Sequence, residues 1–254
     1  MKIKAIALNT FKEAIRDRVL YLLFFFAAVA VIFSRLLAIL TVGDRVKIIK
    51  DVGLASINLF GVLMAVLIGT GLVYKEIDKK TIYALISKPI HRHEFLVGKF
   101  FGLVLTLFVM TTLMSLIFLI IVFLHTFKIE LNLLLAILFI FIELVLLTAV
   151  AILFSCFSTP ILSSLFSLSF YLIGHFSWGF QTLLQRTKSA ALRLFIQALS
   201  IVLPDLESFN FKTEVVHGLT VLPRFYLFSA LYGIVYTLFI LMLAILIFKK
   251  RDFV

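Results

Sequence analysis

The sequence has little of what soluble catalytic domains use. It contains one cysteine and four prolines in 254 residues, and a single cysteine, Cys156, excludes both an intramolecular disulfide and a cysteine metal cluster. It also lacks a Walker A phosphate-binding loop, a Gly-x-Ser-x-Gly elbow and a His-Glu-x-x-His helix. We therefore expect a chain that is not an enzyme and that binds no metal or other cofactor itself.

The sequence is rich in long apolar runs. Hydrophobic residues make up 63% of the chain and its mean hydropathy is +1.19, whereas soluble domains are about 45–50% apolar. Six apolar runs are long enough to cross a bilayer core of ~30 Å. They lie at residues 19–40, 54–74, 95–124, 132–157, 161–178 and 226–248. The sequence thus predicts an all-α integral membrane protein with six transmembrane helices in a single domain, residues 1–254.

The charge pattern predicts the orientation of this domain. The formal net charge is +11, and most of the excess flanks the apolar runs on one side, as the positive-inside rule expects. We therefore expect both termini and the charged block at 75–94 to be cytoplasmic, and we expect no nucleic-acid partner.

Three segments outside the predicted spans have distinct patterns. Residues 1–18 interleave basic and apolar side chains at helical spacing, which favours an amphipathic elbow helix in the membrane interface, or alternatively an extension of the first span. Residues 41–53 read as a polar loop. Residues 179–224 include an amphipathic stretch too short to span, so we expect an extracytoplasmic interfacial or re-entrant segment there.

Glu143 is the one acid inside a predicted span. An ionised group at mid-bilayer costs about 2.5–3.5 kcal/mol on insertion scales, so such a residue is a functional candidate by default. It could be protonated, face a cavity, or pair with another span, where His175 is a candidate partner. The alternative is a polar contact between helices that only fixes their packing.

The charged block between the second and third runs is the most informative stretch of the chain. Two turns of helix fit between Thr81 and Ser87, and Pro89 stops them. The charged, polar and apolar side chains around this helix could bind a soluble partner: Glu76, Asp78, Lys80, Thr81, Leu85, Ser87, Lys88, Pro89, His91 and Arg92. The alternative is an ordinary loop whose charges only enforce topology. On a helix His91 and His93 would point apart, so we expect no metal site there.

This block resembles the segment after span two in type 2 ABC-transporter permeases. Its matching positions run from Glu76 and Thr81 through Pro89 and Arg92 to Gly98-Lys99. Residues 11–18 resemble the elbow helix of the same family, and residues 203–210 and 248–253 are similar to its outer segment and tail in a bacterial six-span branch. The order of these matches on six spans makes the set specific.

The resemblance implies a permease subunit of an ATP-driven exporter in a prokaryotic cytoplasmic membrane. Its block at 75–94 would be the coupling helix, received by a cytoplasmic P-loop ATPase present in two copies. That ATPase, not this chain, would bind ATP and Mg²⁺. A second permease subunit, identical or different, and membrane lipids would be further partners, and the outer segment leaves room for an extracytoplasmic accessory protein. The cargo stays open.

Two other classes of function remain open from the residues. An ATP-independent, proton-coupled carrier centred on Glu143 would be driven by a pH gradient without any ATPase. A membrane anchor of a larger complex would conduct nothing, and substitutions along a transport pathway would then be silent.

Overall fold

The structure is a computed structural model, and it describes residues 2–40, 44–78, 91–128, 130–176, 179, 193–194, 196–197 and 204–250. The regular elements in these ranges are helices. The long ones are α2 (Arg18–Leu40), α3 (Arg45–Asp78), α5 (Arg92–Thr126), α6 (Leu131–Ser155) and α11 (Pro223–Lys250). The short ones are α1 (Lys2–Ile15), α7 (Pro160–His175), the 3-10 helix η1 (Leu206–Phe209) and α10 (Lys212–His217). The predicted all-α class is confirmed for this part of the chain.

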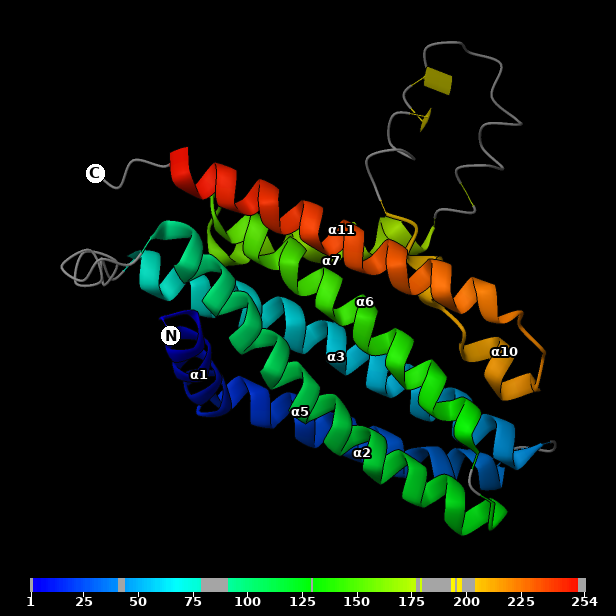
Figure 1. Cartoon of the computed structure of the whole chain (residues 1–254). Helices are drawn as coiled ribbons and strands as arrows, with labels where there is room; N and C mark the ends of the chain where they lie inside the picture. Colours follow the sequence, from blue (N-terminus) through cyan, green and yellow to red (C-terminus); the bar gives the residue numbers. More distant parts are fainter. Residues whose placement is uncertain are drawn as a thin grey trace.

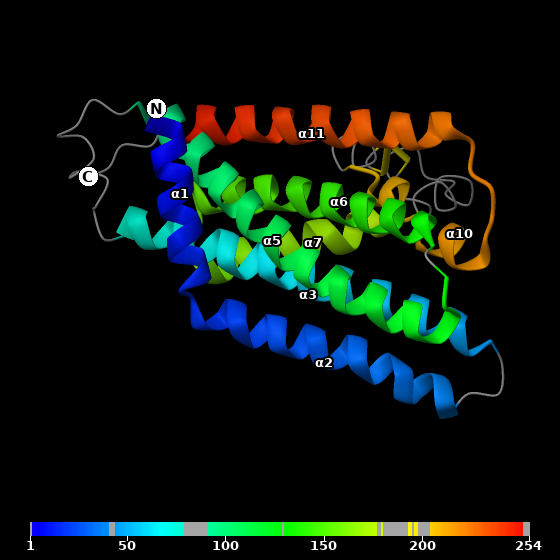
Figure 2. The same cartoon turned by 60° about the horizontal axis from the view of Figure 1, so that its bottom comes forward.

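The five long helices run side by side along one direction (Figures 1 and 2). In α3 and α6, 67% and 61% of the most apolar window is buried, against 28% in α2, so α3 and α6 form the centre of the bundle. The N-terminus, the end of α3, the start of α5 and the end of α11 meet at one end, which we call the basic end (Figure 1). We call the opposite end the far end.

Five helices are long and apolar enough to cross a membrane. They correspond to the predicted spans at 19–40, 54–74, 95–124, 132–157 and 226–248. The remaining predicted span, 161–178, corresponds to α7, which has 16 residues. At 1.5 Å per residue α7 is about 24 Å long, shorter than the ~30 Å of a bilayer core. The sixth crossing therefore stays a prediction.

The predicted polar loop at 41–53 is wrong in extent, because α3 already begins at Arg45. Lys50, one of the polar residues of this stretch, has a partner that stabilises its position on a helix. Lys50 is only 8% exposed, and its ammonium lies 2.6 Å from a carboxylate oxygen of Glu130, just before α6. Ile49 is buried beside it. The sequence showed the charges of this stretch but not the carboxylate that receives one of them.

Residues with strong backbone preferences mark several helix ends. Pro160 occupies the first turn of α7, where its missing N–H costs nothing. Gly218 follows α10 with a positive φ of 67°, a conformation that suits glycine. At the start of α5, Glu94 accepts a hydrogen bond of 2.9 Å from the backbone N–H of His91. These ends set the lengths of the helices around the site.

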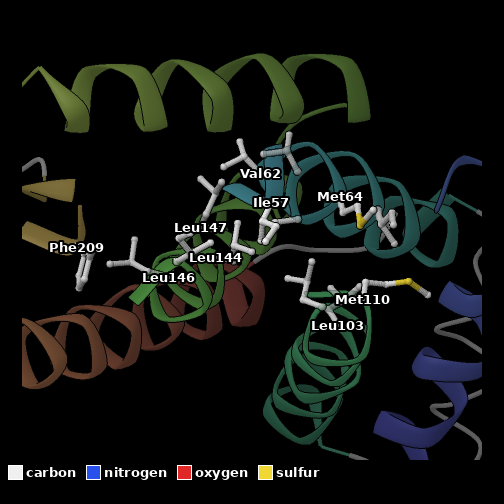
Figure 3. Packing of buried hydrophobic residues seen from close by; sticks show 14 of the residues in the cluster. Ile57, Val62, Met64, Leu103, Met110, Leu144, Leu146, Leu147 and Phe209 are labelled. Carbon is white, nitrogen blue, oxygen red and sulfur yellow. The ribbon is translucent and has the colours of Figure 1, made fainter. Parts of the chain in front are cut away.

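The core is a continuous apolar cluster that joins the central helices to η1. Figure 3 shows part of it. Its labelled members come from α3, α5, α6 and η1: Ile57, Val62, Met64, Leu103, Met110, Leu144, Leu146, Leu147 and Phe209. Since η1 belongs to the segment predicted to lie outside the spans, part of that segment packs into the bundle.

The predicted elbow is a helix of its own. α1 ends at Ile15 and α2 begins at Arg18, and the carboxylate of Asp17 accepts a hydrogen bond of 2.9 Å from the backbone N–H of Val19. Figure 2 shows α1 lying across the direction of the long helices. The first eighteen residues are thus not a straight extension of the first span.

Candidate functional site

The predicted partner-binding block lies at the basic end, between α3 and α5. Six of its candidate residues lie outside the residues that the structure describes: Lys80, Thr81, Leu85, Ser87, Lys88 and Pro89. Glu76 and Asp78 belong to the last turn of α3, and His91 and Arg92 stand at the start of α5. Both ends of the block therefore continue directly into long helices, while the assignment of its residues to a partner stays a prediction.

The two histidines of the block lie closer together than their spacing suggested. The rings of His91 and His93 stack with centroids 5.4 Å apart, because His91 is the extended N-cap residue and not part of the helix. The expectation that they point apart was therefore wrong. In the described part of the chain no group of three His, Cys, Asp or Glu side chains could hold a metal ion.

The start of α5 is fastened to two other elements. A guanidinium nitrogen of Arg92 donates a hydrogen bond of 2.9 Å to the backbone oxygen of Lys249, in the last turn of α11. On the other side α1 packs closely on α5, and a Cβ added to Gly102 would lie 2.5 Å from the Cβ of Thr10 and 2.6 Å from the backbone oxygen of Ala7. A motion of α5 would therefore reach α1 and α11 directly.

An ion pair between a buried lysine and a partly exposed glutamate lies in the α1–α5 contact. Lys99 is 1% exposed, and its ammonium is 3.4 Å from a carboxylate oxygen of Glu13. A second, longer pair joins Lys2 to Glu94 at 3.9 Å. The sequence placed Lys99 in the coupling motif, but nothing in the spacing identified Glu13, on another helix, as its partner.

The second candidate region is a polar cluster around Glu143, near the middle of α6. The Glu143 side chain is 1% exposed. One carboxylate oxygen lies 2.6 Å from Nε2 of His175, and the other accepts a hydrogen bond of 3.1 Å from the amide of Asn58 on α3. Tyr171 on α7 donates a hydrogen bond of 3.0 Å to the amide oxygen of Asn58. The pairing of Glu143 with His175 that the sequence suggested is present. Together with Asn58 and Tyr171 it connects α3, α6 and α7.

The cluster continues outward through His175. Its Nδ1 lies 2.9 Å from a carboxylate oxygen of Glu207 on η1. The other carboxylate oxygen of Glu207 accepts a hydrogen bond of 2.7 Å from the amide of Asn210. A chain of side chains thus leads from a fully buried carboxylate to one whose side chain is 42% exposed.

Lys212, on α10, adds a positive charge beside this chain. Burial lowers the pKa of Lys212 from its ordinary value, and the negative charges of Glu143 and Glu207 partly offset that effect. Lys212 thus lies within the electrostatic field of both carboxylates. Sequence reasoning missed Lys212, Glu207 and Asn58. Glu207 and Lys212 lie in the segment between spans, and Asn58 is a neutral residue within a predicted span.

The segment that carries Glu207 enters the bundle. Leu206 is fully buried against Gly174, where an added Cβ would lie 2.7 Å from it. Phe209, 1% exposed, packs on Gly233, about ten residues and 15 Å into α11. These contacts show that residues 204–217 pack against the long helices, while the choice between an interfacial and a re-entrant segment for residues 179–224 stays a prediction.

A groove lies between α2, α3 and α7. It encloses about 470 Å³ and is lined mainly by apolar side chains, with Asp17 and Thr70 among the polar ones. The hydroxyl groups of Thr70 and Ser164 are 2.9 Å apart and join α3 to α7 at this groove. The helices that correspond to the second and fifth predicted spans are therefore in contact beside an open, mostly apolar volume.

Comparison with known families gives one match. A family model described as "ABC-2 family transporter protein" matches residues 4–253. No curated protein matches the chain. The matched range includes the helices from α2 to α11 and all but the first two residues of α1, and with them both the basic-end contacts and the polar cluster.

Proposed function

The chain belongs to the ABC-2 family of transporter proteins, and from this premise we propose that it is the permease subunit of an ATP-driven exporter. The match across residues 4–253 is the observation that carries the proposal. The chain itself would hydrolyse no ATP. Two copies of a separate P-loop ATPase would bind ATP and Mg²⁺ and supply the work.

The basic end would be cytoplasmic and would receive that work. The charged block at 75–94 connects the end of α3 to the start of α5, so a force on the block acts on two long helices at once. The contacts of Arg92 with α11 and of Gly102 with α1 would spread the motion. Coupling between distant sites requires an element with two states, and we propose the predicted helix between Thr81 and Pro89 for that role.

The cargo would pass along α3 and α7. These helices border the groove of about 470 Å³, and exposed apolar side chains cover α7, among them Ile161, which is 82% exposed. A second permease subunit, identical or different, would complete the pathway there. The membrane would be a prokaryotic cytoplasmic membrane, with both termini inside and room for an accessory protein outside.

The test of this proposal is co-purification in mild detergent from the native host, followed by mass spectrometry. We expect a stoichiometric P-loop ATPase, and we expect the Arg92→Ala and Glu76→Ala variants to lower stimulated ATPase activity without loss of membrane insertion. Lys47→Ala is the matched control, because Lys47 pairs with Asp44 at the far end, away from the block. Recovery of the chain without any ATPase, or full activity in both basic-end variants, would contradict the proposal.

A second candidate function has support from the polar cluster. Glu143, His175 and Glu207 contact one another in that order from the centre of the bundle to its surface. A proton-coupled carrier could use this arrangement. Such a carrier would transport cargo in sealed vesicles under an imposed pH gradient with no ATPase present. The exporter would not.

A further inference from the structure

His175 lies between two carboxylates, and this geometry constrains the number of protons that the three groups share. Its two ring nitrogens are 2.6 Å from Glu143 and 2.9 Å from Glu207. A neutral imidazole has one N–H and one lone pair, so it can donate to only one of two ionised carboxylates. Both contacts are hydrogen bonds only if the three groups hold one proton more, on the imidazole or on a carboxyl group.

The surroundings of the three groups balance that charge. Lys212 on α10 interacts electrostatically with both carboxylates. The neutral neighbours are Asn58 on α3 and Tyr171 on α7, whose ring is 4.7 Å from that of His175. Tyr232 on α11 accepts a hydrogen bond from the backbone N–H of Asp205, just before η1. With a cationic imidazole, two carboxylates and one ammonium, the group is neutral, which suits burial in a bundle.

The three groups also form a route. The exposed fraction of the side chains falls from 42% at Glu207 through 19% at His175 to 1% at Glu143. Glu207 stands on the segment 204–217, and the other two stand on α6 and α7. The extra proton is therefore held at the joint between that segment and the bundle, with one carboxylate partly exposed at the surface of the chain.

We propose that Glu143, His175 and Glu207 form one proton-binding site, reached through Glu207, that fastens the segment 204–217 to the bundle. When the proton leaves, the neutral imidazole donates to one carboxylate only, and the other oxygen faces a nitrogen lone pair. The contact that loses its donor is the one to Glu207, because Glu143 is buried and keeps its bond to Asn58. That this segment closes the outer end of a cargo pathway rests on the proposed function, whereas the proton site does not.

Labelling of an engineered cysteine tests the site. In a Cys156→Ser background, Leu206→Cys places a thiol at a fully buried position of η1, which a membrane-impermeant maleimide reaches only when the segment moves out. Leu219→Cys, at an exposed position at the far end, corrects for the ordinary pH dependence of thiol labelling. If Leu206→Cys prevents insertion, Ser208→Cys on the same turn replaces it.

We expect the ratio of the two labelling rates to rise about tenfold or more between about pH 6 and about pH 9, because one hydrogen bond to a charged group is lost across the range in which imidazoles titrate. Glu207→Gln should abolish that rise while the segment stays closed. The Gln amide can donate to Nδ1 of a neutral imidazole, so the variant needs no extra proton. His175→Ala should give fast labelling throughout.

Two results would overturn the proposal. One is a labelling ratio that stays constant with pH in the parent chain, and the other is a Glu207→Gln variant that keeps the full rise. Labelling needs neither ATPase nor cargo, so these outcomes are independent of the exporter test. A chain that co-purifies with an ATPase but shows no pH-dependent labelling retains the proposed function and loses the proton site.

Discussion

Two joints of the bundle are fastened in different ways. At the basic end α1 and α5 meet through glycine, with backbone and side chain so close at Gly102 that no Cβ fits. Near the middle of the bundle, the segment 204–217 meets the helices through the acid–histidine–acid contacts of Glu143, His175 and Glu207. The first joint also holds the Lys99–Glu13 ion pair, and the second also packs on Gly174 and Gly233. Only the second joint, however, contains a histidine shared between two carboxylates.

The difference shows which joint can respond to conditions. Close packing at a glycine depends on shape and does not change with pH or ligand. Hydrogen bonds among acids and a histidine depend on a proton. In an exporter the first kind of joint suits the transmission of force from a partner, and the second suits an element that must open and close.

Removal of the central carboxylate should have the largest effect. Glu143→Ala leaves His175 and Asn58 without their shared partner, and we expect a loss of about 3 kcal/mol or more in the free energy of unfolding, as for a broken buried pair. Glu143→Gln retains hydrogen-bonding atoms and should lose clearly less. Unfolding in mixed micelles with increasing dodecyl sulfate measures both. Equal losses in the two variants would mean that the charge alone matters.

An added methyl group at the basic end should have the next largest effect. Gly102→Ala forces α1 away from α5, and overpacking of this kind costs about 1–3 kcal/mol. Gly71→Ala is the control, because nothing lies within 4 Å of its added Cβ and alanine favours the helix by about 1 kcal/mol. The midpoint temperatures of thermal unfolding should fall for the first variant only. An unchanged midpoint for Gly102→Ala would show that α1 is not held in this contact.

The smallest effect should come from the ion pair between α3 and α6. Glu130→Ala removes the carboxylate that pairs with the nearly buried ammonium of Lys50. We expect this to lower the free energy of unfolding by about 1–2 kcal/mol. Lys50→Met removes the cation and leaves the better exposed Glu130 to water, so it should cost less. The same thermal unfolding experiment orders the two. A larger loss for Lys50→Met would contradict this account of the pair.

The sequence predicted the helices better than the polar contacts between them. Long apolar runs locate α2, α5, α6 and α11 to within three residues at each end, because crossing the bilayer requires a minimum apolar length. The start of α3 was missed because Lys50 looks like a loop residue until its partner Glu130 is known. Glu143 was recognisable as an acid in an apolar run. Its partner Asn58 lies 85 residues away in the chain, and no local pattern joins them.

For the partner-binding block the position could be predicted and the contacts could not. Its ends at Asp78 and Arg92 lie at the basic end, while the residues between 79 and 90 lie outside the described structure and their roles stay predictions. The packing of α1 on α5 shows the same difference between a position that can be predicted and a contact that cannot. Gly98 and Gly102 are four residues apart, a spacing that lets two helices approach closely, but the helix that packs on them could be identified only from the fold.

By itself, the sequence determined that this protein is a helical membrane protein and where its charges gather, because hydropathy and charge act on each segment separately. Tertiary structure decided which charges meet. It brought Glu143, His175 and Glu207 from three elements into one chain of contacts, and it packed a segment expected to be interfacial or re-entrant beside Gly174 and Gly233. Contacts of this kind depend on the path of the backbone between distant residues, and a local pattern in one sequence does not contain that path.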